Sequence, residues 1–524
     1  MKKVKTTVNP NDFQQLSKLA RGAWLKQDQN GFHALVVLLS RYHANKAETI
    51  FLIGLDFKQQ GLRTEAKNAF RNALEMDDTR HDAAVELADL EAITGNPEVA
   101  YELLESYAPK LKNSPMYADM AGTCYVNIGL PEKALEMHEI AHALQPGVDI
   151  FAGNLAASRG FVGDFEGAKA LYEQLLAKNP GHQRNHYHLA RLGKAQSYDH
   201  IEQMKSVLTG DDLRDIFLLN ALGKEYEDLG YFDEAFNYYR RAADAVYEQT
   251  QHDVEIDLSV LRYQKNQLGA VKPDTGRARI VGEPTPIFIV GLPRTGSTLL
   301  EQLLSRHDSI ETLGETAFID SALRACTSVE TGVHRISAAE LEEYDRAPDP
   351  RFVREYYLSK TQFRLQGKPY FIDKMPYNFL LIDKIWEAFP DAIVINTRRD
   401  PIDTCFSMYK QIFTNAYLYS YSLSDLRKYY TAYDEYIQMA SNLADPRFLT
   451  VQYEDLVTDP ESQLRGVIER LGLAFVPQIL MEDPSRSVSM TASAAQIREG
   501  IQAGYRQNWR NFESHLSPLM GLLS

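Results

Sequence analysis

Cysteine is scarce in this sequence, and long apolar runs are missing. The 524 residues include three cysteines, Cys124, Cys326 and Cys405, which lie far apart and show no metal-ligand spacing. So sparse and odd a set is typical of a reducing compartment. No stretch approaches the roughly 20 apolar residues that span a membrane, and no run of signal-peptide length follows the basic N-terminus. We therefore expect a cytoplasmic protein without a membrane partner.

Positive charge is also in short supply. Lys and Arg total 56 against 71 Asp and Glu, which gives a net charge of -15. General nucleic-acid binding needs a basic excess to neutralise phosphates, so we expect no nucleic-acid partner. A small anionic ligand in a local basic pocket stays compatible with this charge. The length is too great for one core and predicts two or three domains.

The first half of the chain repeats itself. Ala66, Ala100, Ala134 and Ala168 are each 34 residues apart, and small, large and glycine positions recur in register around them. Small residues let two helices cross closely, and a glycine ends the first helix of each pair. The pattern resembles the tetratricopeptide repeat over about residues 45–250, with a degenerate unit near 185–208. Residues 11–45 predict a further, less regular helical pair.

Arrays of this kind form a curved groove that binds extended peptides or partner proteins. We therefore expect a protein or peptide partner in the groove. The alternative is that the array only stabilises the second half of the chain or a homodimer. Asn154, Asn185 and Asn220 lie at or near first-helix positions, where polar residues often face a ligand, although exposure to solvent is the simpler interpretation.

The helical pattern ends at residues 268–284, where Gly and Pro recur. We place a helical array at 1–267, a linker at 268–284 and a second domain at 285–524. In that domain, short apolar runs alternate with helices, which is typical of a parallel sheet with crossover helices. The strand-like runs are 286–290, 370–372, 392–396 and 448–452. The predicted fold class is thus multidomain, with an all-α solenoid followed by an α/β P-loop-like domain.

The run 286–290 leads into Gly291-Leu-Pro-Arg-Thr-Gly-Ser-Thr298 and a helix. Gly291 and Gly296 let the backbone turn sharply, and the free N–H groups at the helix start favour phosphate. The spacing is one residue away from the nucleotide-triphosphatase loop Gly-x4-Gly-Lys-Ser/Thr. The lysine is missing and Ser297 stands in its place, while Arg294 supplies a cation inside the loop.

A second anion site is predicted after the run 392–396. Asp400 can cap a helix that has Pro401 at its first position. Arg399 lies at the mouth of that helix, and Ser407 lies about two turns inside it. An arginine and a hydroxyl beside a helix start favour a phosphate. Two anion sites on one sheet suit a nucleotide with phosphates at both ends of its ribose.

These residues resemble the sulfotransferase family over about 284–520, and the family's donor is 3′-phosphoadenosine 5′-phosphosulfate. The resemblance implies that the 5′-phosphosulfate lies on the loop and that Arg399 and Ser407 hold the 3′-phosphate. Tyr453, in Tyr453-Glu-Asp-Leu-Val457, matches a family segment and is a further donor-binding candidate. The loop residues implied are Gly291, Pro293, Arg294, Thr295, Gly296, Ser297 and Thr298.

Within the family, the pattern is most similar to the tyrosylprotein sulfotransferases. The resemblance implies that Glu315, 21 residues after Arg294, is the base and that Lys374 is a catalytic cation. Arg294 and Lys374 would neutralise charge that develops as the donor leaves, and no metal is needed. The small-molecule branch carries a His two residues beyond the lysine, whereas this chain has Pro376.

The resemblance also implies a closing element in Arg498-Glu-Gly500, followed by Asn508-Trp-Arg510. Arg498 is a donor-binding candidate, but Glu499 replaces an expected cation and weakens this contact. The function that these residues imply is sulfuryl transfer to an acceptor hydroxyl, with a protein or peptide tyrosine favoured by the repeat array. Two alternatives stay open: a P-loop kinase or triphosphatase, and an inactive scaffold that binds partner proteins.

Overall fold

The computed structural model describes residues 9–269, 282–327, 336–346, 349–413, 416–481 and 507–523. Its contacts divide the chain into two compact units, Met1–Asn154 and Leu155–Ser524. The division falls inside the helical array, not at the predicted linker 268–284, because the later helices pack on the α/β domain. Most of that linker lies outside the described residues, so the predicted domain boundaries stay a prediction.

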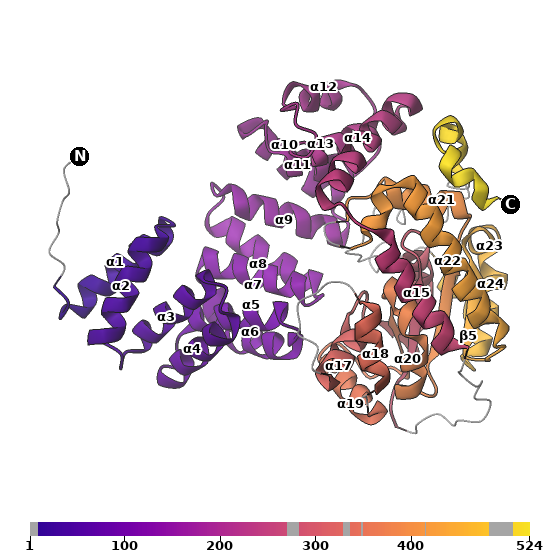
Figure 1. Ribbon diagram of the computed structural model, residues 1–524. Coiled ribbons are helices and arrows are strands. Elements are labelled where there is room, and N and C mark those ends of the chain that lie inside the picture. Colours follow the sequence, from indigo (N-terminus) through magenta and orange to yellow (C-terminus); the bar gives the residue numbers. More distant parts are fainter. Residues whose placement is uncertain are drawn as a thin grey trace. The chain divides into compact units, whose positions relative to one another are not determined.

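The first unit is a stack of antiparallel helix pairs, and the repeat pattern continues into the second unit (Figure 1). The helices before the sheet are α1 Phe13–Leu25, α2 Gln29–Tyr42, α3 Ala47–Gln59, α4 Arg63–Met76, α5 His81–Ile93, α6 Pro97–Leu111, α7 Pro115–Asn127, α8 Pro131–Leu144, α9 Asp149–Val162, α10 Phe165–Lys178, α11 Gln183–Ala190, α12 Asp199–Ser206, α13 Ile216–Asp228, α14 Phe232–Thr250 and α15 Val254–Leu268. The expected helical pair before residue 45 is present as α1 and α2, and the degenerate unit is the short pair α11 and α12.

The repeat spacing has a direct steric reason. A Cβ atom at Gly54 on α3 would lie 2.5 Å from the ring of Phe70 on α4, sixteen residues later. The same pairing recurs in the second unit, where a Cβ at Gly223 would lie 2.7 Å from the Tyr239 ring. Glycine lets the two helices of each pair approach and lets the aromatic ring fill the contact. The predicted tetratricopeptide-like solenoid is therefore confirmed.

A five-stranded parallel sheet forms the centre of the second unit, in the order β2-β3-β1-β4-β5. The strands are β1 Thr285–Gly291, β2 Ile310–Thr312, β3 Tyr370–Asp373, β4 Ile393–Arg398 and β5 Phe448–Gln452. The α-helices after β1 are α16 Ser297–Ser305, α17 Phe318–Cys326, α18 Ala338–Arg346, α19 Pro350–Thr361, α20 Ile382–Ala388, α21 Pro401–Tyr409, α22 Leu423–Asn442, α23 Tyr453–Thr458 and α24 Pro460–Arg470. Short 3-10 segments are η1 Pro376–Leu381, η2 Leu418–Tyr421, η3 Pro477–Leu480, η6 Asn508–His515 and η7 Ser517–Leu522.

Both faces of the sheet are covered, as a parallel sheet requires. Phe288 and Val290 of β1 enter a core shared with α20, α21 and α22. The alternate residues Ile287 and Ile289 enter a second core, built largely from α16 and α24. The α/β fold with a parallel sheet is therefore confirmed, and its central strand β1 leads straight into the predicted loop.

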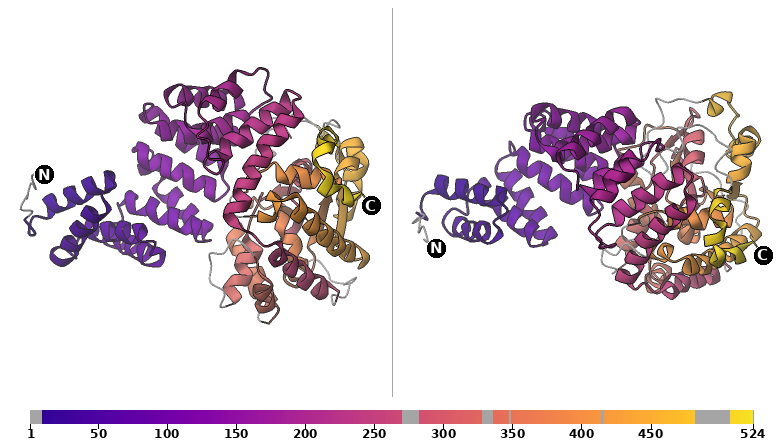
Figure 2. Two further views of the ribbon diagram at one scale, coloured as in Figure 1. Left: turned by 45° about the horizontal axis from the view of Figure 1, so that its top comes forward. Right: turned by 90° about the horizontal axis from the view of Figure 1, so that it is seen from above.

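The last repeat helices share one hydrophobic core with the α/β domain. Helices α15 and α22 pack against each other, and the further views in Figure 2 agree. Phe236 on α14 stacks on His515 with ring centroids 4.4 Å apart, and Phe232 meets Phe512 at 5.2 Å. Removing these helices would therefore expose a large apolar face of the α/β domain.

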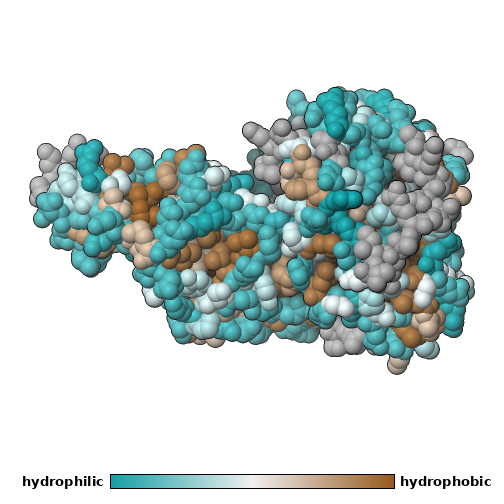
Figure 3. Space-filling view, turned by 90° about the horizontal axis from the view of Figure 1, so that it is seen from below, coloured by the Kyte–Doolittle hydropathy of each residue, from teal (hydrophilic) through white to brown (hydrophobic). Residues whose placement is uncertain are grey.

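The surface is mainly hydrophilic on the face seen in Figure 3, where apolar patches are separated by polar side chains. Exposed large apolar side chains include Leu25 and Ile256, and some apolar exposure is normal for globular proteins. Among the helices of the described residues, none combines the length and the hydropathy needed to cross a bilayer.

Candidate active site

The loop after β1 is shaped by two glycines. Gly291 has φ +136°, and a Cβ there would lie 2.7 Å from the carbonyl oxygen of Thr397. Gly296 has φ +93°, and a Cβ there would lie 2.5 Å from the ring of Tyr453. Side chains are excluded at both positions by left-handed backbone and by close neighbours. The turn therefore brings the backbone against β4 and against the start of α23.

Hydrogen bonds from a side chain of the loop stabilise its conformation. The Thr295 hydroxyl donates to the carbonyl oxygen of Leu292 at 2.7 Å and shares a hydrogen bond with the Thr397 hydroxyl, also at 2.7 Å. Pro293 is half-buried, and Arg294 holds φ +72°, a backbone conformation that is rare outside glycine and is typical of functional sites.

Helix α16 begins directly after the loop with two buried hydroxyl residues. Gly296 caps the helix and, having no side chain, makes no side-chain cap hydrogen bond. Ser297 and Thr298 occupy that turn and are 6% exposed each. The first N–H groups of a helix and its positive dipole end attract an anion. The structure thus gives the loop the features of an anion cradle.

The second predicted anion site lies at the start of α21. The Asp400 carboxylate accepts from the backbone N–H groups of Ile402 and Asp403 at 2.9 Å each, and Pro401 is the first helical residue, as expected. Arg399 donates to the carbonyl oxygen of Arg294 at 3.4 Å. Ser407 is half-buried further along α21. The two predicted phosphate sites therefore adjoin each other through Arg399.

Tyr453 contacts both the loop after β1 and Arg399. Its ring lies against Gly296, and the Arg399 guanidinium lies 4.9 Å from the centre of the ring. Burial is the main cause of a raised pKa for the Tyr453 hydroxyl. The cation–π contact holds the Arg399 guanidinium beside the loop, so Tyr453 positions this cation.

The predicted catalytic pair meets at the ends of β2 and β3. The Lys374 ammonium lies 2.5 Å from a Glu315 carboxylate oxygen and 3.7 Å from a Glu301 oxygen. Lys374 is fully buried, whereas 47% of the Glu315 side chain is exposed. The backbone N–H of Lys374 donates to the carbonyl oxygen of Gly314 at 2.9 Å, which fixes the two segments together. One buried cation is thus shared by two carboxylates, one of which faces solvent.

Glu301 and Asp373 are site residues that the sequence did not single out. Burial raises the pKa of Glu301, and the charge of Lys374 opposes that rise. Glu301 lies in the second turn of α16, four residues after Ser297. The Asp373 carboxylate accepts from the hydroxyls of Thr316 at 2.6 Å and Tyr357 at 2.8 Å. Burial raises its pKa to about 7.

The C-terminal segment is held at the second anion site. The Asp403 carboxylate accepts from the backbone N–H groups of Gln507 at 2.7 Å and Trp509 at 3.2 Å. The Arg399 guanidinium lies 3.6 Å from the same carboxylate. Arg498 lies outside the described residues, so its predicted donor contact stays a prediction. The segment that follows it nevertheless docks beside Arg399.

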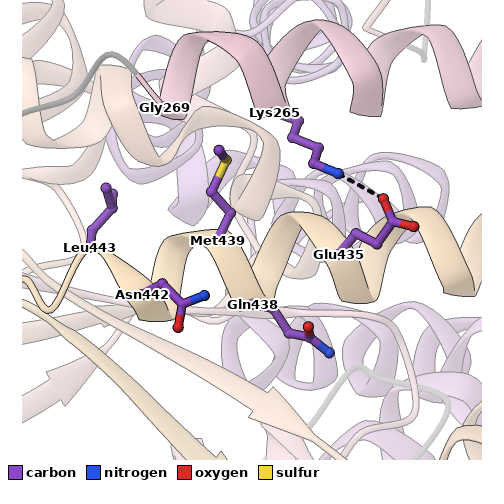
Figure 4. A pocket seen from close by; sticks show the side chains of 7 residues that line it. All are labelled: Lys265, Gly269, Glu435, Gln438, Met439, Asn442 and Leu443. Carbon is purple, nitrogen blue, oxygen red and sulfur yellow. Dashed lines mark hydrogen bonds and ion pairs between the residues drawn. The ribbon is translucent and has the colours of Figure 1, made fainter.

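A surface pocket of about 460 Å³ lies elsewhere, between α15 and α22 (Figure 4). Lys265 and Glu435 line it and pair with each other at 2.7 Å, and Met439 is a third lining residue. None of the predicted site residues lines this pocket. We therefore place the candidate active site at the carboxyl ends of the strands, where parallel sheets bind ligands.

Two of the three array asparagines are buried, whereas the simpler interpretation expected them to face solvent. Asn185 and Asn220 are 9% and 4% exposed. The Asn220 amide donates to the carbonyl oxygen of Lys410 at 2.8 Å, and the Asn154 amide donates to the Asp119 carboxylate at 3.0 Å. These side chains satisfy interior contacts of the fold.

Comparison with known proteins finds family matches in both halves of the chain. Residues 286–477 match the sulfotransferase family, and residues 51–115 and 218–245 match tetratricopeptide repeats. An uncharacterized protein of Aquifex aeolicus (strain VF5) is 25% identical over 383 residues, which are 69% of this chain and 48% of that protein. This chain thus spans about half the length of that relative.

Two further relatives carry named activities. A putative protein-tyrosine sulfotransferase of Caenorhabditis briggsae is 24% identical over 43% of this chain and 80% of its own. The omega-hydroxy-beta-dihydromenaquinone-9 sulfotransferase Stf3 of Mycobacterium tuberculosis (strain CDC 1551 / Oshkosh) is 29% identical over 37% of this chain and 64% of its own. The chain is therefore similar to the sulfotransferase family over residues 286–477, and to tetratricopeptide repeats over residues 51–115 and 218–245.

Proposed function

We propose that this chain transfers a sulfuryl group from 3′-phosphoadenosine 5′-phosphosulfate to an acceptor hydroxyl, with a tyrosine of a protein or peptide as the favoured acceptor. The family and the relatives support sulfuryl transfer. The observation that carries the proposal is the contact of Glu315 with the buried Lys374. It joins a solvent-facing carboxylate to a cation in a domain that also holds an anion cradle.

The residues fit the proposed donor. The cradle at Gly291 and Gly296 leaves no room for a Cβ, so an anion could approach the backbone closely. The start of α16 would hold the 5′-phosphosulfate, and Arg399 with Ser407 would hold the 3′-phosphate. When bound, the donor supplies an activated sulfur–oxygen bond to its phosphate.

The roles of the chain's own residues follow from their placement. Glu315 is exposed and would accept the proton of the acceptor hydroxyl as that oxygen forms its bond to sulfur. Lys374 would donate a hydrogen bond to the phosphate oxygen whose bond to sulfur breaks. For both to act, the Lys374–Glu315 contact has to open, and Glu301 remains as the partner that keeps the ammonium in place. Arg294 would stabilise negative charge on the loop side.

An aromatic cluster that includes Tyr377, three residues after Lys374, supports a tyrosine acceptor. The rings of Tyr377 and Tyr417 have centroids 5.1 Å apart, and Phe413 lies 4.9 Å from Tyr417. Burial is the main cause of a raised pKa for the Tyr417 hydroxyl, and the charges of Tyr377 and Glu315 add to the rise. All three rings are half-buried and could pack on a phenol ring. Stf3 carries the name of a menaquinone sulfotransferase, so a lipid acceptor is the second candidate.

The repeat array supports the polypeptide part of the proposal, because tetratricopeptide grooves are typical protein-binding surfaces. Homodimer formation stays a prediction. A kinase or triphosphatase would need a cation at the position of Ser297, and Ser297 is buried at the start of α16. The scaffold alternative leaves the Lys374–Glu315 contact unexplained.

Glu315→Gln tests the assignment of the base. Radiolabelled sulfuryl transfer from the donor to a tyrosine peptide, a simple phenol and a long-chain alcohol is measured with a chelator present. We expect wild type to act on the peptide and the phenol, and the variant to lose about 10²- to 10⁴-fold in rate, as for loss of a general base. Donor-product binding should stay within about twofold of wild type.

Glu355→Gln is the control, because Glu355 is exposed on α19. Transfer that persists in Glu315→Gln would show that the base lies elsewhere. Transfer to the alcohol alone would favour a lipid acceptor, and a strict need for added metal would contradict the proposed metal-independent mechanism.

A further inference from the structure

Two histidines and a glutamate form a continuous hydrogen-bonded chain across the degenerate repeat unit. His186 on α11 has its Nε2 atom 2.7 Å from the carbonyl oxygen of Pro180 and its Nδ1 atom 2.8 Å from Nε2 of His200 on α12. The other ring nitrogen of His200, Nδ1, lies 2.5 Å from a carboxylate oxygen of Glu225 on α13. These contacts join three helices of the second unit. The proposed sulfuryl transfer uses none of these residues.

Both ends of the chain are shielded from water. His186 is 1% exposed and Glu225 is 4% exposed, whereas His200 is half-buried. The second carboxylate oxygen of Glu225 is buried and has no hydrogen-bond partner among the described residues. An ionised carboxylate is costly to bury unless a cation or hydrogen bonds compensate it. Glu225 therefore depends on its contact with His200.

The hydrogen bonds fix the number of protons in the chain. A carbonyl oxygen only accepts, so Nε2 of His186 carries a proton. The contact between the two imidazoles needs one proton, and so does the contact between His200 and Glu225. Three hydrogen bonds thus need three protons, whichever group holds each of them. Two neutral imidazoles supply two, so one further proton has to be bound from solvent.

The surrounding charges favour a position for that proton between His200 and Glu225. Burial is the main cause of a lowered pKa for His186, and the charges of His200 and His182 add to the lowering, whereas the Pro180 carbonyl and the Glu225 charge oppose it. A second proton on His186 is thus disfavoured. Charged groups elsewhere on these helices have other partners, in the pairs Arg184–Phe217, Arg191–Gln411, Asp199–Ser197, Lys205–Glu202, Lys224–Asp228 and Glu227–Lys410.

Helix α13 also attaches the repeats to the α/β domain. The Asn220 amide donates to the carbonyl oxygen of Lys410 at 2.8 Å, and Lys410 is the residue that caps the C-terminal end of α21. The Lys410 ammonium lies 2.7 Å from the carboxylate of Glu227. Glu225 lies between Asn220 and Glu227 along α13. A displacement of α13 at Glu225 would therefore disturb both contacts with the α/β domain.

We propose that His186, His200 and Glu225 form a proton-binding site that makes the attachment of α13 to the α/β domain depend on pH. The inference goes beyond the proposed function and does not rest on it. When the third proton is lost, a buried carboxylate faces an unprotonated nitrogen, and the chain of hydrogen bonds opens. Exposed histidines have a pKa of about 6.5, so the opened chain holds no third proton at about pH 7.5 and above. The closed state is therefore lost as the pH rises.

Glu225→Gln tests the proton count, because a glutamine amide N–H can donate to Nδ1 of His200. This variant makes the same three hydrogen bonds without a proton from solvent. Hydrogen–deuterium exchange of the full chain, corrected for the intrinsic exchange rate, gives the equilibrium constant for local opening at pH 7.5 and pH 8.5. For peptides of α11 to α13 and the end of α21, we expect this constant to rise up to about tenfold in wild type, as for one proton. In Glu225→Gln it should change by less than about twofold.

Glu234→Gln is the matched control, because Glu234 is exposed on α14, and it should keep the pH dependence of wild type. Glu225→Met removes the carboxylate without replacing its hydrogen bond. It should open more readily at both pH values and show no pH dependence, so it decides the question if the glutamine variant does not fold. Equal pH dependence in wild type and the Glu225 variants would overturn the proton-binding site. A rise in wild type that is confined to α11 and α12 would overturn its link to the α/β domain.

Discussion

Lys374 is the residue on which the site geometry depends, since its ammonium is fully buried between Glu301 and Glu315. Removing one partner of a buried charge is costly, because the other charge is left uncompensated. In the proposed mechanism, Glu315 would leave the contact to take a proton while Glu301 stays paired with the lysine. Resemblance to a known family indicated Glu315 and Lys374 from the sequence. It gave no sign of Glu301, whose role depends on how α16 packs beside β2.

Asp373 provides a pH-dependent test at the residue scale. Its pKa is 3.8 in an ordinary environment and about 7 in the folded protein, chiefly because the carboxyl is buried. The folded state therefore holds the proton more tightly than the unfolded chain does. This contribution to stability is fully present below the unfolded pKa of 3.8 and is lost as the pH rises through the folded value of about 7.

Asp373→Asn removes the titration and retains an oxygen that can accept from Thr316 and Tyr357. From pH 5 to pH 8, the free energy of unfolding of wild type should fall by roughly 2–3 kcal/mol relative to the variant. Urea unfolding at the two pH values measures this difference. Glu461→Gln, which changes a half-exposed carboxylate, should show no such trend. If the free energy of unfolding changed with pH in the same way in Asp373→Asn and wild type, the raised pKa of Asp373 would be contradicted.

At the scale of elements, four strands, the loop and both helix starts could be predicted from apolar runs and turn residues. Strand β2 could not, because three residues at a sheet edge give no periodicity. The left-handed backbone of Arg294 was equally hidden, since nothing in the local sequence demands it. The contacts of Tyr453 with Gly296 and Arg399 join residues that are far apart in the chain, so only the folded sheet reveals them.

Gly296→Ala tests the loop as an element. The added Cβ would meet the Tyr453 ring on a left-handed backbone, so we expect a loss of about 2–4 kcal/mol in stability and weaker binding of adenosine 3′,5′-bisphosphate. Gly466→Ala is the control with the opposite sign. Gly466 lies inside α24 with open space around it, and alanine there should stabilise by up to about 1 kcal/mol. Equal stability and binding in Gly296→Ala and wild type would show that the loop is not held against Tyr453.

At the scale of the whole molecule, the two parts predicted from the sequence do not coincide with the two compact units of the structure. The repeat pattern places the array before residue 268, yet the helices from 155 onward belong to the same compact unit as the sheet. Sequence periodicity detects a helix pair but not what its outer face packs against. Only the structure therefore reveals the aromatic contacts of Phe232 and Phe236 with the C-terminal segment. The same is true of the hydrogen bond from Arg191 to the Gln411 side chain.

The central claim is that the anion cradle and the arginines around it serve a 3′,5′-bisphosphorylated nucleotide. The most direct measurement compares thermal unfolding of the full chain with adenosine 3′,5′-bisphosphate and with ATP and Mg²⁺. A ligand at about 100 times its dissociation constant stabilises a protein by about 2.7 kcal/mol, which is readily detected. We predict that the bisphosphate raises the unfolding temperature and that ATP with Mg²⁺ leaves it unchanged. Stabilisation by ATP and Mg²⁺ alone would contradict it and favour a kinase or triphosphatase.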